Sequence, residues 1–556
     1  MKHLNLLLAA AFLSVSTILP AQGYLKGKIL YFDNGISITE RGGSSFDFSL
    51  LGGLDTKSSV SLLSVERALE KAAEDPEIAM VFIRPDKMSA SLSTCEEIRE
   101  SLARFRQKGK PVVCYGVSFS NASYYLGSVA DRVFMHPGSS GTLNGLSSNL
   151  LYYKDLLDTL GVEVQLIRHG SYKSAGEPYI RSEISPENRE QYEVLLSSIW
   201  NPVVGSIAAS RGLEEEKVRQ IVDGLELNGS QDWLDHGLVD GLKYRDEMQA
   251  YLSHLFGESE LSVVKKVSMS DYVKKLKDNG SDKVAVIYAE GEIVRSGSGI
   301  AGEKFSSEIA RVRADSSVKA VVLRVNSPGG EVVAADMIRR EIELLRKHKP
   351  VIASYGDYAA SGGYLISAGT DRIFVDNSTL TGSIGVFGQS IVYGGALKKL
   401  LHINAYSVGT NAHSDLGSGF RPMDEKEVEW YQKSIDNIYD TFVGVVGEGR
   451  GMSRESVDSI AQGRVWAGKD ALGIGLADET GILMDAVRYA ASKAGITRYR
   501  IVAYPAKKGF LEELRSRKAS DKSDPIVRVR EVLPPGFTMV ARLPYIRIEG
   551  TGTRKQ

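Results

Sequence analysis

A serine beside paired glycines is the residue of this chain whose setting first suggests covalent chemistry. Ser361 lies in the run AASGGY (residues 359–364), and a second glycine pair closes the run NSPGG (residues 326–330). Glycine lets backbone N–H groups point into a cavity with no side chain in the way, which stabilisation of an oxyanion requires. A serine at a strand-to-helix turn also faces the unpaired N–H groups of that helix. The pattern predicts that Ser361 is a nucleophile.

A serine hydroxyl is a weak nucleophile at neutral pH and needs a neighbouring base. The candidates are His413 and a lysine of lowered pKa, and spacing alone does not choose, because bases come from distant parts of a fold. Lys173 lies among small residues in the run GSYKSAG, where burial can lower its pKa from about 10.4. We therefore favour Lys173, with Ser383 in the run TGS as a candidate to orient its amine. The alternative for Lys173 is a surface lysine paired with Glu177.

The chain contains an internal duplication at a constant offset of 240 residues. Residues 115–145 recur as residues 355–385, with Tyr, Gly, Asp, Arg and Phe at matching places. The copies differ where chemistry would lie, because Asn121 of the first copy matches Ser361 of the second, while Lys173 matches a histidine. Each copy holds what the other lacks, and we interpret Asn121 as the vestige of a lost active site.

Short apolar runs alternate with amphipathic ones in both copies. The expected strands are 28–32, 80–84 and 111–115 in the first copy and 283–288, 320–325 and 350–355 in the second; the expected helices are 62–73, 95–107, 305–313 and 334–347. Such alternation is typical of βαβ units and predicts an α/β fold with largely parallel sheets and flanking helices.

Length and composition indicate a soluble protein of two domains. The chain has 556 residues, 43% of them hydrophobic and 25% charged, with a formal net charge of −1. Near-zero charge argues against a nucleic-acid partner. No histidine or cysteine pattern has the spacing of a metal site, so we predict no metal and no cofactor. Cys95 and Cys114 are expected to be buried free thiols.

The predicted domains follow the duplication. Residues 24–266 form a domain that contributes the lysine, and residues 267–504 form one that contributes the serine. Residues 505–556 form a basic tail, with 12 Lys/Arg against 6 Asp/Glu from residue 506. We expect it to be a solvated extension, and the alternatives are docking on a neighbouring subunit or on anionic lipid. Residues 1–23 read as an export signal whose apolar run of 16 residues is shorter than the roughly 18 to 20 that span a bilayer. A cleaved signal is favoured over a short membrane anchor.

Four motifs in order resemble the signal peptide peptidase A (protease IV) family in its long duplicated form. They are YKSAGEPYIR at residues 172–181, RVNSPGG at 324–330, YAASGGY at 358–364 and TGSIG at 381–385. The resemblance implies tandem domains of the Clp-protease and crotonase type, with the catalytic serine and lysine supplied by different halves. The chain departs from the family at Gly176 and Tyr179, where a larger apolar residue and a Phe are common.

The resemblance also implies residue roles. Ser361 is expected to be the nucleophile, Lys173 the general base and Ser383 the hydroxyl that holds the lysine amine. The backbone N–H groups of Gly330 and Gly362 are expected to form the oxyanion hole.

Substrates and location follow from the same resemblance. It implies a serine endopeptidase that degrades cleaved signal peptides and other unfolded peptides. It also implies a homo-oligomer, such as a tetramer, in the bacterial cell envelope. That location is the inner membrane facing the periplasm, or the soluble periplasm if the signal is cleaved. The alternatives are a crotonase-type enzyme acting on coenzyme A thioesters and a noncatalytic scaffold of the same fold.

Overall fold

The computed structural model describes residues 24–32, 35–42, 59–278, 280–505 and the backbone of 537–542. The expected export signal and most of the basic tail lie outside the described residues. The chain forms two compact units. Unit 1 contains the described residues of 1–147 and 200–277, and unit 2 those of 148–199 and 278–547. The segment that carries Lys173 therefore belongs to unit 2, together with Ser361.

Unit 1 contains a parallel sheet whose strands are ordered β8-β6-β5-β4-β1-β9. The strands are β1 Lys28–Tyr31, β4 Ile78–Ile83, β5 Val112–Gly116, β6 Arg132–Met135, β8 Gly241–Leu242 and β9 Lys266–Ser268, with a separate pair β2 Ser37–Thr39 and β3 Ser59–Ser61. The helices are α2 Leu62–Glu74, α3 Leu92–Gln107, α4 Asn121–Gly127, α8 Glu215–Asp223, α9 Ser230–Asp235, α10 Arg245–Leu255 and α11 Met269–Lys275, with a 3₁₀ turn Pro85–Lys87. Strand β5 is buried along its whole length, as expected for a parallel strand covered on both faces.

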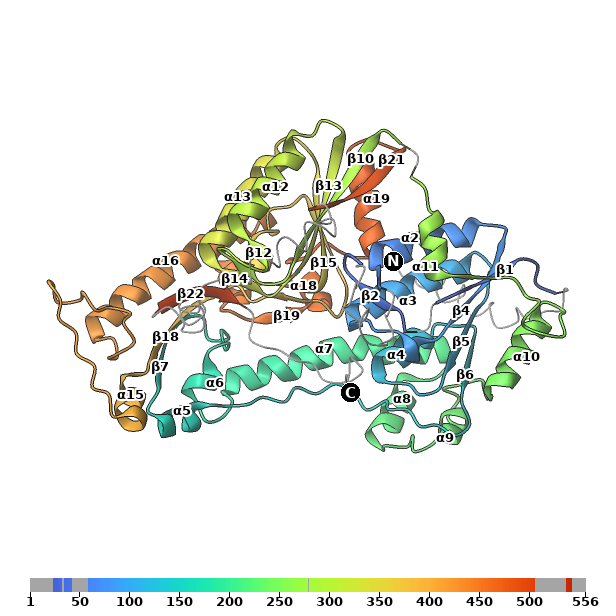
Figure 1. Cartoon of the computed structure of the whole chain (residues 1–556), viewed down its shortest axis with the longest axis horizontal. Coiled ribbons are helices and arrows are strands. Elements are labelled where there is room, and N and C mark those ends of the chain that lie inside the picture. Colours follow the sequence, from blue (N-terminus) through green and yellow to red (C-terminus); the bar gives the residue numbers. More distant parts are fainter. Residues whose placement is uncertain (1–23, 33–34, 43–58, 279, 506–536, 543–556) are drawn as a thin grey trace. The chain divides into compact units, whose positions relative to one another are not determined.

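Unit 2 is organised around a larger, mostly parallel sheet, ordered β19-β17-β15-β13-β10-β21, with β16 beside β15 and β20 beside β16. Its strands are β10 Asp282–Glu290, β13 Val318–Ser327, β15 Val351–Ala360, β16 Arg372–Val375, β17 Leu380–Gly382, β19 Val465–Ala467, β20 Glu479–Thr480 and β21 Tyr499–Tyr504. Helices α12 Gly302–Ala314 and α13 Val332–Arg346 lie on one side of this sheet and α19 Leu483–Lys493 on the other (Figure 1). The predicted α/β fold class is thus confirmed, because helices flank the main sheet of each unit and that sheet is largely parallel.

A second sheet of unit 2 joins the lysine segment to the second copy. Its order is β12-β11-β14-β22-β18-β7. The strands are β7 Glu163–His169, β11 Ile293–Val294, β12 Ile300–Ala301, β14 Gly329–Glu331, β18 Val386–Val392 and β22 Phe537–Arg542. Strands β7 and β18 pair antiparallel over seven residues. Strand β22 shows that part of the tail expected to be solvated instead pairs with β14 and β18.

The remaining helices of unit 2 flank these sheets. They are α5 Lys154–Leu160, α6 Glu177–Ile180, α14 Gly362–Leu365, α15 Gly394–Leu401, α16 Glu425–Arg450, α17 Arg454–Ile460 and α18 Gly468–Gly473, while α7 Pro186–Arg211 begins in unit 2 and ends in unit 1.

Every strand and helix expected from the apolar pattern is present within a few residues of its predicted bounds. Cys95 and Cys114 are both buried, as predicted, and neither forms a disulfide. Within the ranges that the structure describes, no helix has the length and apolar character needed to span a bilayer.

Candidate active site

Ser361 is held in a strained backbone conformation between β15 and α14. Its φ and ψ are 54° and −116°, a region that residues with a side chain seldom occupy and that costs about 1 to 3 kcal/mol. Two hydrogen bonds fix it: the Ser361 N–H donates to the Gly382 carbonyl at 2.8 Å, and the Leu365 N–H donates to the Ser361 carbonyl at 2.9 Å. The surrounding backbone thus sets the direction of the serine side chain.

Ser383 has the same kind of strain in the next loop. Its φ is 48°, and its N–H donates to the Arg464 carbonyl at 2.7 Å. The side chains of Ser361 and Ser383 are both fully buried. Two strained, buried serines beside one another are unusual, and such strain concentrates at functional sites.

Lys173 extends its amine between these two serines. Its Nζ lies 2.9 Å from Ser361 Oγ, 2.9 Å from Ser383 Oγ and 3.1 Å from the Ser383 carbonyl oxygen. The lysine is fully buried, and loss of solvation lowers its pKa from 10.5 to about 7. The structure therefore brings together the three side chains expected at the site, in a geometry in which a neutral amine can accept a hydroxyl proton.

Glu177 does not pair with Lys173, so the salt-bridge alternative is wrong. Its carboxylate, fully buried, accepts hydrogen bonds from Ser185 Oγ at 2.7 Å and Asn188 Nδ2 at 3.2 Å. Arg168 lies 3.4 Å from the same carboxylate and donates to the Lys173 carbonyl at 2.9 Å. This network anchors the backbone of the lysine segment. The only sign of this network in the sequence was Glu177, an acidic residue four positions after Lys173.

The family departure at Gly176 has a local explanation. A Cβ at Gly176 would lie 2.4 Å from Leu166 Cδ1, so the Leu166 side chain fills the place of a larger residue. Tyr179 is stacked on Tyr153, with ring centroids 5.9 Å apart. The lysine segment is thus packed by residues of its own neighbourhood.

The glycine pairs bring backbone very close to backbone. A Cβ at Gly363 would lie 2.6 Å from the Ser327 carbonyl oxygen, which locks the AASGGY turn against the NSPGG turn. Gly330 has φ 153°, and a Cβ there would lie 1.9 Å from the Ile293 carbonyl oxygen. Gly362 is the first residue of α14, where N–H groups have no intrahelical acceptor.

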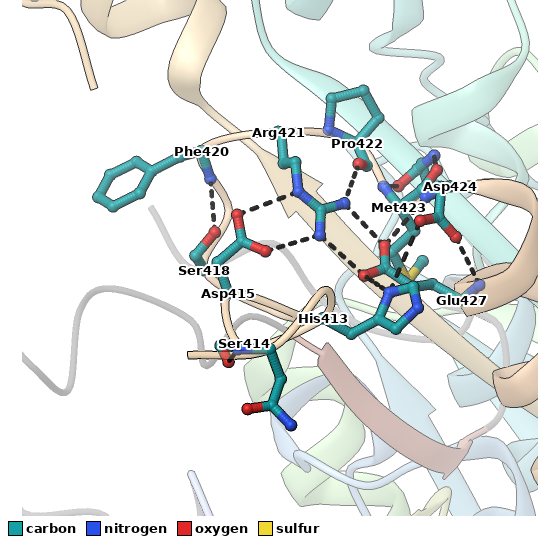
Figure 2. Close-up of polar contacts among 12 residues, drawn as sticks. His413, Ser414, Asp415, Ser418, Phe420, Arg421, Pro422, Met423, Asp424 and Glu427 are labelled. Atoms are coloured by element: carbon teal, nitrogen blue, oxygen red, sulfur yellow. Dashed lines mark hydrogen bonds and ion pairs between the residues drawn. The ribbon is translucent and has the colours of Figure 1, made fainter. Parts of the chain in front are cut away.

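His413 lies in an ion-pair cluster that Figure 2 shows. Its Nδ1 is 2.9 Å from Glu427 Oε1 and 3.6 Å from Asp424 Oδ2. Arg421 donates to both oxygens of Glu427, at 2.7 and 2.8 Å, and to both oxygens of Asp415. The contacts of His413 are therefore with acids of this cluster, whereas the contact of Ser361 Oγ is with Lys173.

The same cluster places three potential metal-ligand atoms within 4.8 Å of one another, from His413, Asp424 and Glu427. The Arg421 guanidinium, however, holds the pKa of the Glu427 carboxyl well below its usual range and occupies both of its oxygens. A cation would have to displace the guanidinium to bind. Arginine already supplies the positive charge that these acids require.

In the first copy an amide replaces the serine and lysine contacts. Asn121 Nδ2 donates to the Gly145 carbonyl at 2.7 Å, and its Oδ1 accepts from the Asn144 N–H at 3.0 Å. The Asn121 side chain thus forms hydrogen bonds with backbone groups of residues 144 and 145, and no lysine amine takes part in these bonds. This is consistent with a structural role for the first copy.

Comparisons with known proteins identify the family to which this chain belongs. The model of "Peptidase family S49" matches residues 104–257 and 343–497, one stretch in each copy. Protease 4 of Haemophilus influenzae is 35% identical over 460 residues, covering 80% of this chain and 74% of that protein. Protease 4 of Salmonella typhi is 33% identical over 504 residues, covering 88% and 80%. The chain is therefore a serine peptidase. It belongs to Peptidase family S49.

Among solved structures, ClpP1 from Listeria monocytogenes matches 36% of this chain and 94% of its own, at 17% identity and a TM-score of 0.24. A likeness at this level carries no argument about activity. The family assignment itself decides between the functional alternatives, and it selects a peptidase over a coenzyme A thioester enzyme or a scaffold.

Replacing Gly330 by Ala is expected to destabilise unit 2. The new Cβ would collide with the Ile293 carbonyl, and such backbone clashes cost about 2 to 4 kcal/mol. Gly291→Ala is the matched control, since Gly291 also has a positive φ of 97° but open space at its Cβ. Thermal unfolding followed by circular dichroism should show a clearly lower midpoint for Gly330→Ala. Equal midpoints for the two variants would contradict the close approach.

Proposed function

We propose that this chain is a serine endopeptidase in which Lys173 is the general base for the nucleophile Ser361. The observation that carries the proposal is a buried amine 2.9 Å from the serine hydroxyl, with its pKa lowered to about 7 by desolvation. At that pKa about half of the molecules hold a neutral amine at pH 7, against roughly one in a few thousand for an exposed lysine. The base is thus available without a histidine.

Hydrogen-bond counting supports Ser383 as the residue that orients the amine. A neutral amine has two hydrogens and one lone pair. Donation to the Ser383 hydroxyl and carbonyl oxygens uses both hydrogens. The lone pair is then left for the Ser361 hydroxyl hydrogen, which is the arrangement that proton abstraction requires.

The reaction follows from these roles. Lys173 takes the proton of Ser361 as its oxygen attacks a peptide carbonyl, and the backbone N–H groups of Gly330 and Gly362 stabilise the oxyanion. The C–N bond then breaks, and the lysine returns its proton to the leaving amine. The lysine next removes a proton from water as the water oxygen attacks the acyl-enzyme carbonyl. The bond between that carbon and Ser361 Oγ then breaks, the lysine returns the proton to Oγ, and the new carboxyl product leaves.

The proposed substrates are cleaved signal peptides and other unfolded peptides. Such peptides can adopt the extended conformation in which a peptide carbonyl reaches Ser361. The export pattern of residues 1–23 supports a location in the bacterial cell envelope, either at the inner membrane facing the periplasm or in the soluble periplasm. We also propose a homo-oligomer. These statements rest on the sequence motifs and the family.

Removing either member of the dyad is expected to abolish peptide hydrolysis. Ser361→Ala and Lys173→Met should each lower kcat/KM on an internally quenched unfolded peptide by at least about 1,000-fold. His413→Ala is the matched control, because a histidine base is the rival mechanism, and it should stay within about threefold of wild type. Full activity in Lys173→Met together with loss in His413→Ala would overturn the dyad.

The pH dependence should report the lysine. Below its pKa the amine is protonated and cannot accept the serine proton, so kcat/KM should fall about tenfold for each pH unit. Above the pKa of about 7 the profile should level off. Initial rates from about pH 5 to about pH 9 measure this, with intrinsic fluorescence at each pH as a check on folding. A flat profile, or one that still rises steeply at the upper end, would contradict a lysine base of lowered pKa.

A further inference from the structure

A short segment of the second copy touches both sides of the proposed dyad. We call residues 462–465, which end at the start of β19, the clamp segment. One of its backbone hydrogen bonds joins it to the lysine segment and two join it to the Ser383 loop. They are Tyr172 N–H to the Gln462 carbonyl at 2.9 Å, Gly463 N–H to the Ile384 carbonyl at 2.8 Å, and Ser383 N–H to the Arg464 carbonyl at 2.7 Å.

The backbone of the clamp segment lies so close to Lys173 that a side chain at Gly463 would collide with it. Gly463 has φ 78°, and a Cβ there would lie 2.5 Å from Lys173 Cβ and 2.7 Å from its Cα and N. A Cβ at Gly385 would lie 2.7 Å from Gly463 Cα and 3.3 Å from Lys173 Cδ. On the other side, a Cβ at Gly170 would lie 2.4 Å from the Gln462 carbonyl. Gly463 and Gly385 thus let backbone pack directly on Lys173, and Gly170 lets the Gln462 backbone lie against the lysine segment.

Side chains fix the clamp segment at both ends. Gln462 has φ 52°, and its Nε2 donates to Asp458 Oδ1 at 2.7 Å and to the Tyr439 hydroxyl at 3.2 Å. That hydroxyl in turn donates to Asp458 Oδ1 at 2.5 Å. At the other end, the Val465 N–H donates to Oε1 of the buried Gln191 at 2.7 Å. The segment is therefore held in place independently of the lysine.

The charged groups on the elements packed around Lys173 have partners of their own in the described part of the chain. These pairs are Arg168 with Glu177 and His169 with Asp436 for the lysine segment, Arg464 with Glu190 of α7, and Asp458 with Tyr439 and Gln462 beside the clamp segment. Loss of solvation is accordingly the cause of the lowered lysine pKa. Whatever excludes water from the amine sets its basicity.

We propose that the clamp segment is a positioning element that keeps water from Lys173 and holds its amine against Ser361. The inference rests on the proposed function and adds the part of the fold that makes this lysine a base. Gly463 is its central residue, because only glycine allows the backbone to lie on the lysine stem. The segment acts through the lysine, with no atom of its own in the reaction.

The test is Gly463→Ala, with Gly475→Ala as its matched control. Gly475 has nearly the same φ, 80°, but its Cβ would meet only Met452 Sδ at 3.9 Å, so it reproduces the backbone strain without touching the lysine. Gly463→Ala should lower kcat/KM at pH 7 by at least about tenfold. The loss should lie in kcat, and the midpoint of the pH profile should move to higher pH, because water reaches the amine. Gly475→Ala should keep the wild-type midpoint.

A milder variant keeps the test decisive if Gly463→Ala does not fold. Tyr439→Phe removes the hydroxyl that anchors Gln462 and keeps the ring that stacks on His169. It should move the midpoint in the same direction by less. Wild-type midpoints in every folded variant would overturn the positioning role while leaving the dyad intact. Independence of the wild-type rate from Lys173 would instead overturn the proposed function, and the clamp role with it.

Discussion

The exclusion of water from one amine is the constraint on which the rest of the site depends. Each pKa unit corresponds to about 1.4 kcal/mol, so lowering the pKa of Lys173 from 10.5 to about 7 costs the fold several kcal/mol. Backbone hydrogen bonds and close packing around the lysine segment offset this cost. The antiparallel pairing of β7 with β18 delivers the lysine, the buried Glu177 network anchors its backbone, and glycine backbone closes over its stem. The strain at Ser361 and Ser383 belongs to the same arrangement, because it aims two hydroxyls at one nitrogen.

The duplication explains how such a site can be divided along the chain. In sequence Lys173 belongs to the first copy, yet in space its segment packs in the unit formed by the second copy. The first copy no longer needs a polar site of its own, because the Asn121 amide satisfies its turn locally. The first copy therefore supplies the segment that carries Lys173, and the second copy supplies the serine, Ser361.

Much of this was predictable from sequence, for identifiable reasons. Strands such as β5 and β13 are short apolar runs bounded by polar residues, and their pattern is local. Ser361 and Lys173 stood out because glycines and small residues surround them. The clamp segment did not stand out in the sequence, because its contacts join residues nearly 300 positions apart, as between Tyr172 and Gln462. Its glycine also resembles the glycine of an ordinary turn. The partners of Glu177 and the positive φ of Ser383 are likewise set by tertiary packing. The domains predicted from the duplication, residues 24–266 and 267–504, stay a prediction.

A direct titration of the Lys173 amine measures the basicity on which the proposed mechanism depends. The protein labelled with ¹³C at the lysine Cε carbons would be followed by NMR across pH, and the spectrum of Lys173→Met would assign the signal. We expect one lysine whose chemical shift titrates with a midpoint near the pKa of about 7 that follows from its burial, well separated from the surface lysines near about 10.4. A Lys173 signal that titrates together with the surface lysines would contradict this mechanism.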